Sequence, residues 1–424
     1  MKEYNRAVLT NGVRVVSRPM PEKKSVALGI WVNVGSRCET PVNSGISHFL
    51  EHMVFKGTGK YTCQKIKESI EGVGGSFNGF TSEEVTCYLV KLPAVYLELA
   101  LDILSEMVVD PIIPRDELER ERTVVLEEIK MYKDQPQSYV HELLDKLLWP
   151  GHPLGMSILG TKASVTSLSR RDLIEYKKSR YTAANIVVSA AGSLDHDELV
   201  EKAVKRFAGL KRSGLNACGK FKGSLKHPQV SLCYKETEQT HLAAGFRGLN
   251  KEHPLRYALS LLNVILGGNS SSRLFSEIRE KRGLAYEIGS GAKFLKDTGA
   301  FIVHAGVDNN KVKDTVELIF RELRRAIREK AGLAELKRAK EFLTGQMLLS
   351  LEDTMDQMFW IGEPTVSLDK TYSPEEIIAK VRQVSLEDLQ QVCRLLFRED
   401  NTHIALIGPV KATESAVSGW ARLK

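Results

Sequence analysis

An internal repeat constrains the fold of this 424-residue chain more than any other sequence feature. The segment from Ser169 to Gly192 matches the segment from Ser385 to Gly408 at a constant offset of 216 residues, without a gap. Each copy has the pattern of a capped helix followed by an apolar strand that ends in glycine. A repeat of this length predicts two domains built on one plan.

Earlier segments of the two halves fit the same plan. Val26–Gly35 and Leu242–Phe246 are apolar and rich in strand-forming residues, and each is followed by a helix-like segment that ends near a glycine. Strands mixed with long amphipathic helices predict an α+β fold, in which each of two homologous domains is a largely antiparallel sheet packed with helices. Apolar periodicity lapses near residue 212, so we expect domains at 1–212 and 226–424, joined by a linker at 213–225.

Composition and charge exclude several classes of protein. Hydrophobic residues make up 42% of the chain and charged residues 27%, values of an ordinary globular protein rather than a disordered or collagen-like one. No uncharged apolar stretch reaches the roughly 18 residues that a membrane span needs, so we expect no membrane partner. The net charge of +7 is spread among interspersed acidic and basic residues, without a basic block that would predict nucleic-acid binding.

The cysteines and the start of the chain suggest a location. The six cysteines are scattered and never form a Cys-x-x-Cys pair, so we expect neither a disulfide framework nor a thiolate zinc site. Residues Met1 to Arg6 lead directly into a strand-like segment, without an apolar signal core or a transit segment. Both observations favour a reducing compartment and predict a cytoplasmic protein.

The helix-like segment of the first half contains the motif His48-Phe-Leu-Glu51-His52. Two histidines at positions i and i+4 lie one turn apart on one helical face, about 5–6 Å between Cβ atoms, so both imidazoles can bind one ion. A zinc ion held by two neutral imidazoles and one carboxylate keeps a position for water, and a nearby base must take the proton of that water. Glu51 has the position of this base.

A structural reading of the motif is the alternative, because a histidine on an apolar helix face is usually a packed core residue. Burial of three ionisable groups in such a helix costs several kcal/mol unless they are paired or bound to a metal. The repeat supplies an internal control, since the equivalent positions of the second half hold Ala258, Leu261 and Leu262. The fold does not require the polar residues, so function explains them better than architecture.

A third ligand must come from another segment. In the helix-like run from Glu117 to Ile129, Glu121 and Glu128 share a face with apolar residues, whereas Glu127 turns away from that face. This pattern favours Glu128 as the ligand and Glu121 as a carboxylate that orients a histidine N–H. Periodicity alone leaves other carboxylates open.

With these residues the sequence resembles the pitrilysin family of inverted-motif zinc peptidases, over nearly the whole chain, and most of all its processing proteases. In that family a zinc-binding glutamate follows the motif by seventy-odd residues, inside a Val-Leu-Glu-Glu-Ile-like run. Val125–Ile129 is such a run, and its Glu128 stands 76 residues after His52. The resemblance therefore implies one Zn²⁺ per chain, bound by His48, His52 and Glu128, with Glu121 at the accessory acidic position.

Two further segments match the family. Gly74–Ser82 resembles an edge strand that binds extended substrate through main-chain hydrogen bonds, with Asn-Gly in place of the commoner Asn-Ala. The substrate-binding residues implied are Ser76, Phe77, Asn78, Gly79 and Phe80. Arg273–Tyr286 resembles a run whose arginine and tyrosine bind substrate near zinc, which assigns Arg279 and Tyr286 to the scissile carbonyl and its developing oxyanion. Without the resemblance, these two residues read as a helix-surface charge and a half-buried aromatic.

The leading hypothesis is therefore a zinc-dependent endopeptidase that hydrolyses unfolded or extended peptides. The resemblance also implies a chamber enclosed by the two domains and a homodimer. The alternative is a non-catalytic core or scaffold subunit of the same fold, although such relatives typically lose motif residues that this chain retains. A nucleic-acid binder is a third and weaker reading.

Overall fold

The computed structural model describes residues 4–212, 218–223 and 228–423. Residues 213–217, 224 and 225 of the predicted linker lie outside the described residues, as do residues 226 and 227 at the start of the predicted second domain. The chain divides into two compact units, and each includes a segment from the other half of the sequence. The first unit comprises Met1–Ile129, Met156–Gly219 and Leu348–Pro374, and the second comprises Lys130–Gly155, Lys220–Met347 and Glu375–Lys424.

The first unit is built on a six-stranded sheet with the order β1-β2-β6-β3-β5-β4. Its strands are β1 (Asn5–Val8), β2 (Arg14–Pro19), β3 (Ser25–Val32), β4 (Ser76–Thr81), β5 (Thr86–Pro93) and β6 (Ile186–Gly192). Strands β2 and β6 are parallel and all other neighbours are antiparallel. Strands β3 and β6 are buried along almost their whole length, which explains their continuous apolar sequences.

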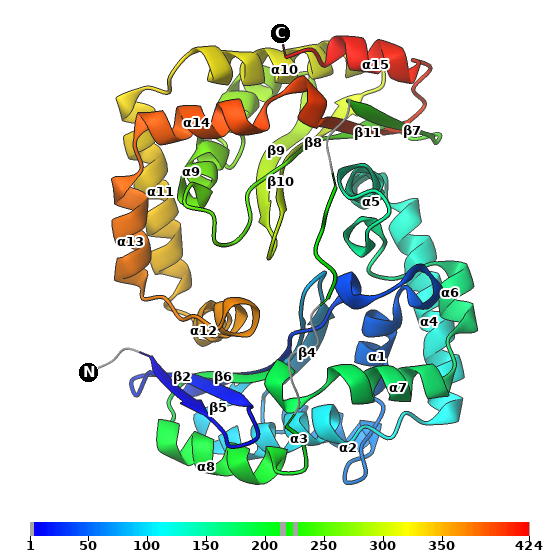
Figure 1. Cartoon of the computed structure of the whole chain (residues 1–424), viewed down its shortest axis with the longest axis vertical. Coiled ribbons are helices and arrows are strands. Elements are labelled where there is room, and N and C mark those ends of the chain that lie inside the picture. Colours follow the sequence, from blue (N-terminus) through cyan, green and yellow to red (C-terminus); the bar gives the residue numbers. More distant parts are fainter. Residues whose placement is uncertain (1–3, 213–217, 224–227, 424) are drawn as a thin grey trace. The chain divides into compact units, whose positions relative to one another are not determined.

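Helices cover both faces of this sheet. Apart from α5 (Pro136–Leu148), which belongs to the second unit, the helices of the first half are α1 (Ile46–Val54), α2 (Cys63–Glu71), α3 (Leu97–Val109), α4 (Arg115–Asp134), α6 (Lys162–Ser167), α7 (Arg170–Arg180) and α8 (His196–Phe207). Helices α3 and α8 pack on one face, and α12 (Thr354–Leu368), from the second half, packs on the opposite face (Figure 1). There Met358 and Ile361 join a buried cluster with Trp31.

The second unit repeats this plan with a five-stranded sheet of order β7-β11-β8-β10-β9. Its strands are β7 (Gln229–Tyr234), β8 (Gln239–Arg247), β9 (Ala285–Phe294), β10 (Gly299–Asp308) and β11 (Thr402–Gly408). Only β7 and β11 are parallel neighbours among these described strands. The α+β prediction with two largely antiparallel sheets is therefore confirmed.

A helix of the first half completes the second unit. Helix α5 (Pro136–Leu148) packs on β8 and β11, where Val140 and Leu144 contact a cluster that includes Ala243 and Ala405. The unit's other helices are α9 (Arg256–Leu266), α10 (Val312–Arg328), α11 (Leu333–Ser350), α13 (Pro374–Gln383), α14 (Leu386–Leu396) and α15 (Glu414–Trp420). The two halves thus exchange helices, α5 in one direction and α12 in the other.

The repeated segments have the structure that their sequences predict. Ser169 and Ser385 begin α7 and α14 with the same capping box, each side chain exchanging hydrogen bonds with the aspartate three residues later. The strands that follow, β6 and β11, are buried throughout. In each sheet this strand lies between a parallel neighbour and an antiparallel one.

The expectation that no disulfide forms is wrong. Cys38 and Cys218, 180 residues apart in the sequence, are joined within the first unit. Arg37 supports this junction, because its guanidinium donates to the Gly219 carbonyl from Nε at 3.2 Å and from Nη2 at 3.1 Å. Folding brings the segment after α8 back to the end of β3, a proximity that no local cysteine spacing reveals. The remaining cysteines, Cys63, Cys87, Cys233 and Cys393, are free.

None of the described helices is both long enough and apolar enough to cross a membrane.

Candidate metal centre

Helix α1 is held at its start by a buried carboxylate. Gly45 precedes the helix and offers no capping side chain, and Glu39 instead accepts hydrogen bonds from the Gly45 N–H at 2.7 Å and the Ser47 N–H at 2.9 Å. Burial raises the pKa of Glu39 to about 7. The apolar side of the helix is fully buried, through Phe49, Leu50, Met53 and Val54. Its polar residues are thereby held in a fixed orientation.

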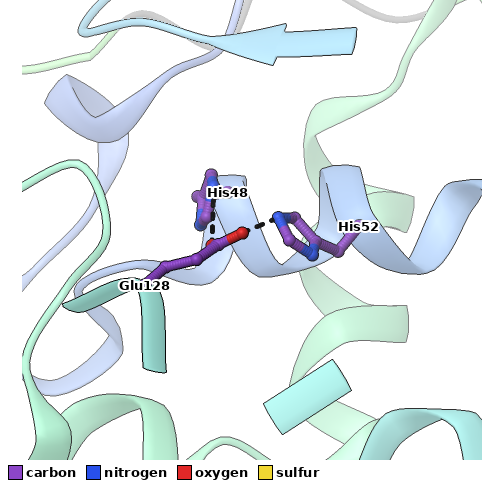
Figure 2. Close-up of side chains that lie close together, drawn as sticks. All are labelled: His48, His52 and Glu128. Atoms are coloured by element: carbon purple, nitrogen blue, oxygen red, sulfur yellow. Dashed lines mark ion pairs between the residues drawn. The ribbon is translucent and has the colours of Figure 1, made fainter. Parts of the chain in front are cut away.

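The two histidines of α1 face a glutamate of α4. In Figure 2, Glu128 points toward both imidazoles, which project from successive turns of one helix. The Glu128 Oε2 atom lies 3.6 Å from His52 Nε2 and 3.9 Å from His48 Nε2. One ligand atom from each of the three residues falls within 4.8 Å of the others. This is the donor set of a zinc site with two imidazoles and one carboxylate.

Two buried polar atoms of these residues lack hydrogen-bond partners among the described residues, as expected of a site that binds a metal ion. Glu128 Oε2 and His48 Nδ1 are buried and have no hydrogen-bond partner within the described part of the chain. Burial, with a smaller contribution from the neighbouring His52, lowers the pKa of His48 to about 3. The imidazole of His48 is therefore neutral at physiological pH, the form that binds a metal. A divalent cation would satisfy the carboxylate oxygen, which at present faces two nitrogens beyond hydrogen-bond distance.

Glu121, also on α4, orients the ring of His52. Its Oε2 lies 3.0 Å from His52 Nδ1, and its Oε1 lies 2.6 Å from Lys56 Nζ. Burial alone would raise the pKa of Glu121, but the bonds from Lys56 and His52 hold that pKa below its usual value. An ionised Glu121 favours the proton on Nδ1 of His52, which leaves the Nε2 lone pair directed at Glu128.

Glu51 lies beside this set without belonging to it. Its side chain is 8% exposed, and its Oε2 accepts a hydrogen bond of 2.8 Å from the Thr81 hydroxyl. Burial raises the pKa of Glu51, the Thr81 bond and His52 oppose the rise, and Glu128 adds to it. A carboxylate with a raised pKa next to a metal site suits proton transfer near neutral pH.

The segment predicted to bind substrate forms β4, the edge strand of the first sheet. Phe77 packs against Phe55 with ring centroids 5.8 Å apart, while Phe80 points to the opposite face and packs against Trp31 at the same distance. Ser76 and Asn78 are exposed, and Gly79 is half-buried. Among the described strands β4 pairs only with β5, and its substrate-binding role stays a prediction.

Arg279 and Tyr286 belong to the second unit. Arg279 lies in a π-helical turn from Phe275 to Glu280, with its guanidinium carbon 4.8 Å from the ring centroid of Phe275 and 5.6 Å from that of Tyr286. Tyr286, on β9, is 75% exposed. Their assignment to the scissile carbonyl stays a prediction, because the metal centre lies in the first unit.

Three residues at the centre were not predicted from the sequence. Thr81 lies two residues beyond Gly79 on the same strand, so both residues lie on one face of the strand. This alternation would have indicated Thr81 once the position of α1 was known. Lys56 follows His52 by four residues, a helical spacing that could have suggested its contact with Glu121. Nothing in the local pattern of Glu39 distinguishes it from other acidic residues.

Comparison with known proteins places the chain in a family. Residues 14–162 match the family described as "Insulinase (Peptidase family M16)", and residues 167–343 match "Peptidase M16 inactive domain". The chain belongs to peptidase family M16. The pitrilysin-type resemblance is thus confirmed. The zinc motif falls in the first M16 match, and the region named inactive is the one with Ala258, Leu261 and Leu262 at the motif positions.

Two curated relatives align over nearly their full length. The Bacillus subtilis (strain 168) protein named "Uncharacterized zinc protease YmxG" is 40% identical over 404 residues, which covers 95% of this chain and 98% of the relative. A Streptomyces coelicolor protein, also named as a zinc protease, is 34% identical over 426 residues, with coverage of 97% and 91%.

Two solved structures share the fold. A protease from Helicobacter pylori superposes with a TM-score of 0.91 at 23% identity, over 96% of this chain and 100% of that one. A Pseudomonas fluorescens structure titled as a peptidase M16 inactive domain gives 0.89 at 22% identity, with coverage of 97% and 98%.

Proposed function

We propose that this M16 chain is a zinc metalloendopeptidase. The observation that carries the proposal is the convergence of His48, His52 and Glu128, whose ligand atoms lie within 4.8 Å of one another. The names of the relatives, which call them zinc proteases, support it. A zinc ion bound there would polarise the scissile carbonyl and lower the pKa of a water molecule.

Each polar residue of the centre then has a distinct task. His48, His52 and Glu128 would hold the ion, and Glu121 would keep the Nε2 atom of His52 deprotonated for that purpose. Glu51 takes a proton from the attacking water and delivers it to the leaving amine. Burial, which raises the pKa of Glu51, strengthens this carboxylate as a proton acceptor.

The substrate is an unfolded or extended peptide. The free side of β4 offers main-chain N–H and C=O groups that a peptide in extended conformation can pair with. A folded protein does not present such a strand without local unfolding. In the same proposal, Arg279 and Tyr286 donate to the scissile carbonyl, and the chamber and the homodimer that the resemblance implies remain predictions.

Metal analysis and one substitution test the proposal. We expect about one zinc per chain, and a chelator should abolish cleavage of an unstructured peptide. Glu51→Gln should remove turnover while zinc stays bound, whereas Glu127→Gln, one residue from the metal ligand, should keep both. Full activity of Glu51→Gln would exclude Glu51 as the base. Protein that lacks zinc and binds a partner without cleaving peptides would instead support the scaffold alternative.

The cytoplasmic prediction has lost part of its support. It depended on the absence of a disulfide, and Cys38 and Cys218 are paired. Disulfides persist mainly in oxidising compartments. Fractionation of the native host, with thiol alkylation before lysis, would show both the compartment and the state of this pair.

A further inference from the structure

Strand β4 contacts helix α1 through alternate residues. Phe77, Gly79 and Thr81 share the face of the strand that meets the helix, where Phe77 packs on Phe55 at its C-terminal end. The last of the three, Thr81, donates its hydroxyl proton to Glu51 Oε2 at 2.8 Å. The strand proposed to bind substrate is therefore in direct contact with the proposed base.

The two carboxylate oxygens of Glu51 have different surroundings. Oε2 is engaged by Thr81, whereas Oε1 accepts no hydrogen bond from any described residue. Oε1 lies next to Gly79, where a Cβ atom would approach it to 3.1 Å and the Phe55 ring to 2.9 Å. A threonine bond on one oxygen and a glycine beside the other fix the plane of the carboxylate and leave Oε1 as its open acceptor.

Edge position makes this contact sensitive to a bound peptide. In the described structure β4 pairs with β5 alone, so only one ladder of hydrogen bonds determines its position. An extended peptide on the free side would add a second ladder and restrict the strand further. Any displacement of β4 moves the Thr81 hydroxyl, and with it the preferred orientation of Glu51.

We propose that Thr81 is a positioning residue, which couples docking of a peptide along β4 to the orientation of the base Glu51. The inference rests on the proposed peptidase function and deepens it. Substrate residues away from the scissile bond contact β4, and through Thr81 these contacts help to orient Glu51. Their binding energy therefore increases the turnover rate instead of only tightening binding. Peptides long enough to pair along β4 are then turned over faster than short ones at saturation.

Substitution of Thr81 tests the coupling in the zinc-loaded full chain. Thr81→Val keeps the shape of the side chain and removes the hydroxyl, whereas Thr81→Ser keeps the hydroxyl. For a long unstructured peptide we expect Thr81→Val to lower kcat by about 10- to 100-fold, the range for loss of a hydrogen bond to a charged group. KM should stay within about twofold, because the lost interaction acts on the reacting centre rather than on binding. Thr81→Ser should restore most of the turnover.

A series of peptide lengths separates positioning from a merely structural role. In the wild type we expect kcat to rise with length until the peptide spans β4, and in Thr81→Val we expect this rise to disappear. Thr344→Val is the matched control, since the Thr344 hydroxyl donates to the Lys340 carbonyl in α11, a helix of the second unit. It should leave the length dependence unchanged. Zinc content and the thermal midpoint should stay at wild-type values in all variants.

Several results would overturn the inference. Unchanged kcat in Thr81→Val would do so, as would an equal loss in Thr81→Ser or a change confined to KM. If Thr81→Val does not fold, Thr81→Ala compared with Thr81→Ser gives the same contrast. A zinc-loaded wild type that cleaves no peptide contradicts the peptidase function itself. An active wild type with an intact length dependence in Thr81→Val contradicts only the role of Thr81.

Discussion

At the metal centre, the orientation of His52 depends on a carboxylate from another helix. Helix α1 places the ring of His52 one turn after that of His48, but the helix alone does not determine which ring nitrogen carries the proton. Glu121 does so, by accepting from Nδ1 at 3.0 Å while Lys56 neutralises its other oxygen. The zinc affinity of the site therefore depends on a residue that is not a ligand.

We expect Glu121→Gln to weaken zinc binding about 10- to 100-fold, because a neutral amide supports the imidazole less than a carboxylate. Competition with a chromophoric chelator at fixed pH measures the dissociation constant. Glu117→Gln is the control, since Glu117 lies one turn earlier on α4 and pairs with the exposed Arg120. Equal affinity of Glu121→Gln and the wild type would show that His52 is oriented by the helix alone.

A buried histidine of the second unit should make stability depend on pH. His403 on β11 is 1% exposed, and burial, with a smaller contribution from Arg247, lowers its pKa to about 4 from an ordinary 6.5. The unfolded chain therefore binds this proton more readily than the folded chain between pH 6.5 and 4. The stabilisation is complete above pH 6.5 and is lost as the pH falls through this window, by up to about 1.4 kcal/mol per pH unit.

Denaturant unfolding of metal-free protein between pH 7 and 4 measures this effect without interference from zinc release. The free energy of unfolding should fall less steeply with acidification in His403→Gln than in the wild type. Other buried histidines, such as His141, contribute to both curves, so the difference between the slopes reports His403. Parallel curves would show that His403 is protonated in the folded state as easily as in the unfolded chain.

At the scale of the elements, helix α12 packs very closely on the first sheet. Its contact position, Gly362, has no room for a side chain. The Trp31 indole donates to the Ser189 hydroxyl at 2.7 Å in a fully buried position, and Gly362 of α12 lies directly over this pair. A Cβ atom at Gly362 would come within 2.7 Å of the Ser189 hydroxyl and would overlap the indole nitrogen. The bond between Trp31 and Ser189 would have to break or the helix would have to move.

Gly362→Ala should therefore destabilise the protein by about 1–3 kcal/mol, the usual cost of overpacking a core. The matched control is Gly345→Ala in α11, where a Cβ atom would meet nothing within 4 Å. There the substitution should stabilise by up to about 1 kcal/mol, because alanine favours the helix. Urea unfolding of the two variants should give shifts of opposite sign. Shifts of the same sign would mean that the packing of α12 does not limit stability.

The same elements show what sequence patterns can and cannot reveal. Local patterns predict the capped helices and buried strands of the repeat, since those depend on residues close in sequence. The apolar face of α12 predicts that the helix is buried but not on which sheet, because periodicity contains no information about partners. The bond between Cys38 and Cys218 is hidden for the same reason.

The candidate site divides in a similar way. His48 and His52 follow from helical spacing, because both residues lie on one helix. Glu128 needed the family resemblance, since several carboxylates of α4 satisfy the periodicity. Thr81 becomes visible only when the structure shows that its strand lies against α1. Residues that meet across elements are thus the part of a site that a single sequence specifies least.

For the whole molecule, the exchange of α5 and α12 means that neither half of the sequence contains a complete unit. The first sheet needs residues 348–374 to cover its second face, and the second sheet needs residues 130–155. Met358, Ile361 and Val366 are almost fully buried against the first sheet. Burial of such side chains contributes about 1.5–3 kcal/mol each, together a large part of the stability of a typical domain.

We therefore expect a chain that ends at residue 219 to fail as an independent domain, although it contains the whole zinc motif, Glu128 and both cysteines of the disulfide. Without α12 it would expose an apolar sheet face around Trp31 and aggregate.

Fusion of residues 348–374 to its end through a flexible linker should restore solubility and zinc binding, because the linker replaces only connectivity. Fusion of a second copy of residues 130–155, the segment that completes the other unit, is the control and should restore neither property. Solubility, sedimentation and zinc content compare the three chains. A soluble, zinc-binding chain that ends at residue 219 would show that the motif half folds without the exchange.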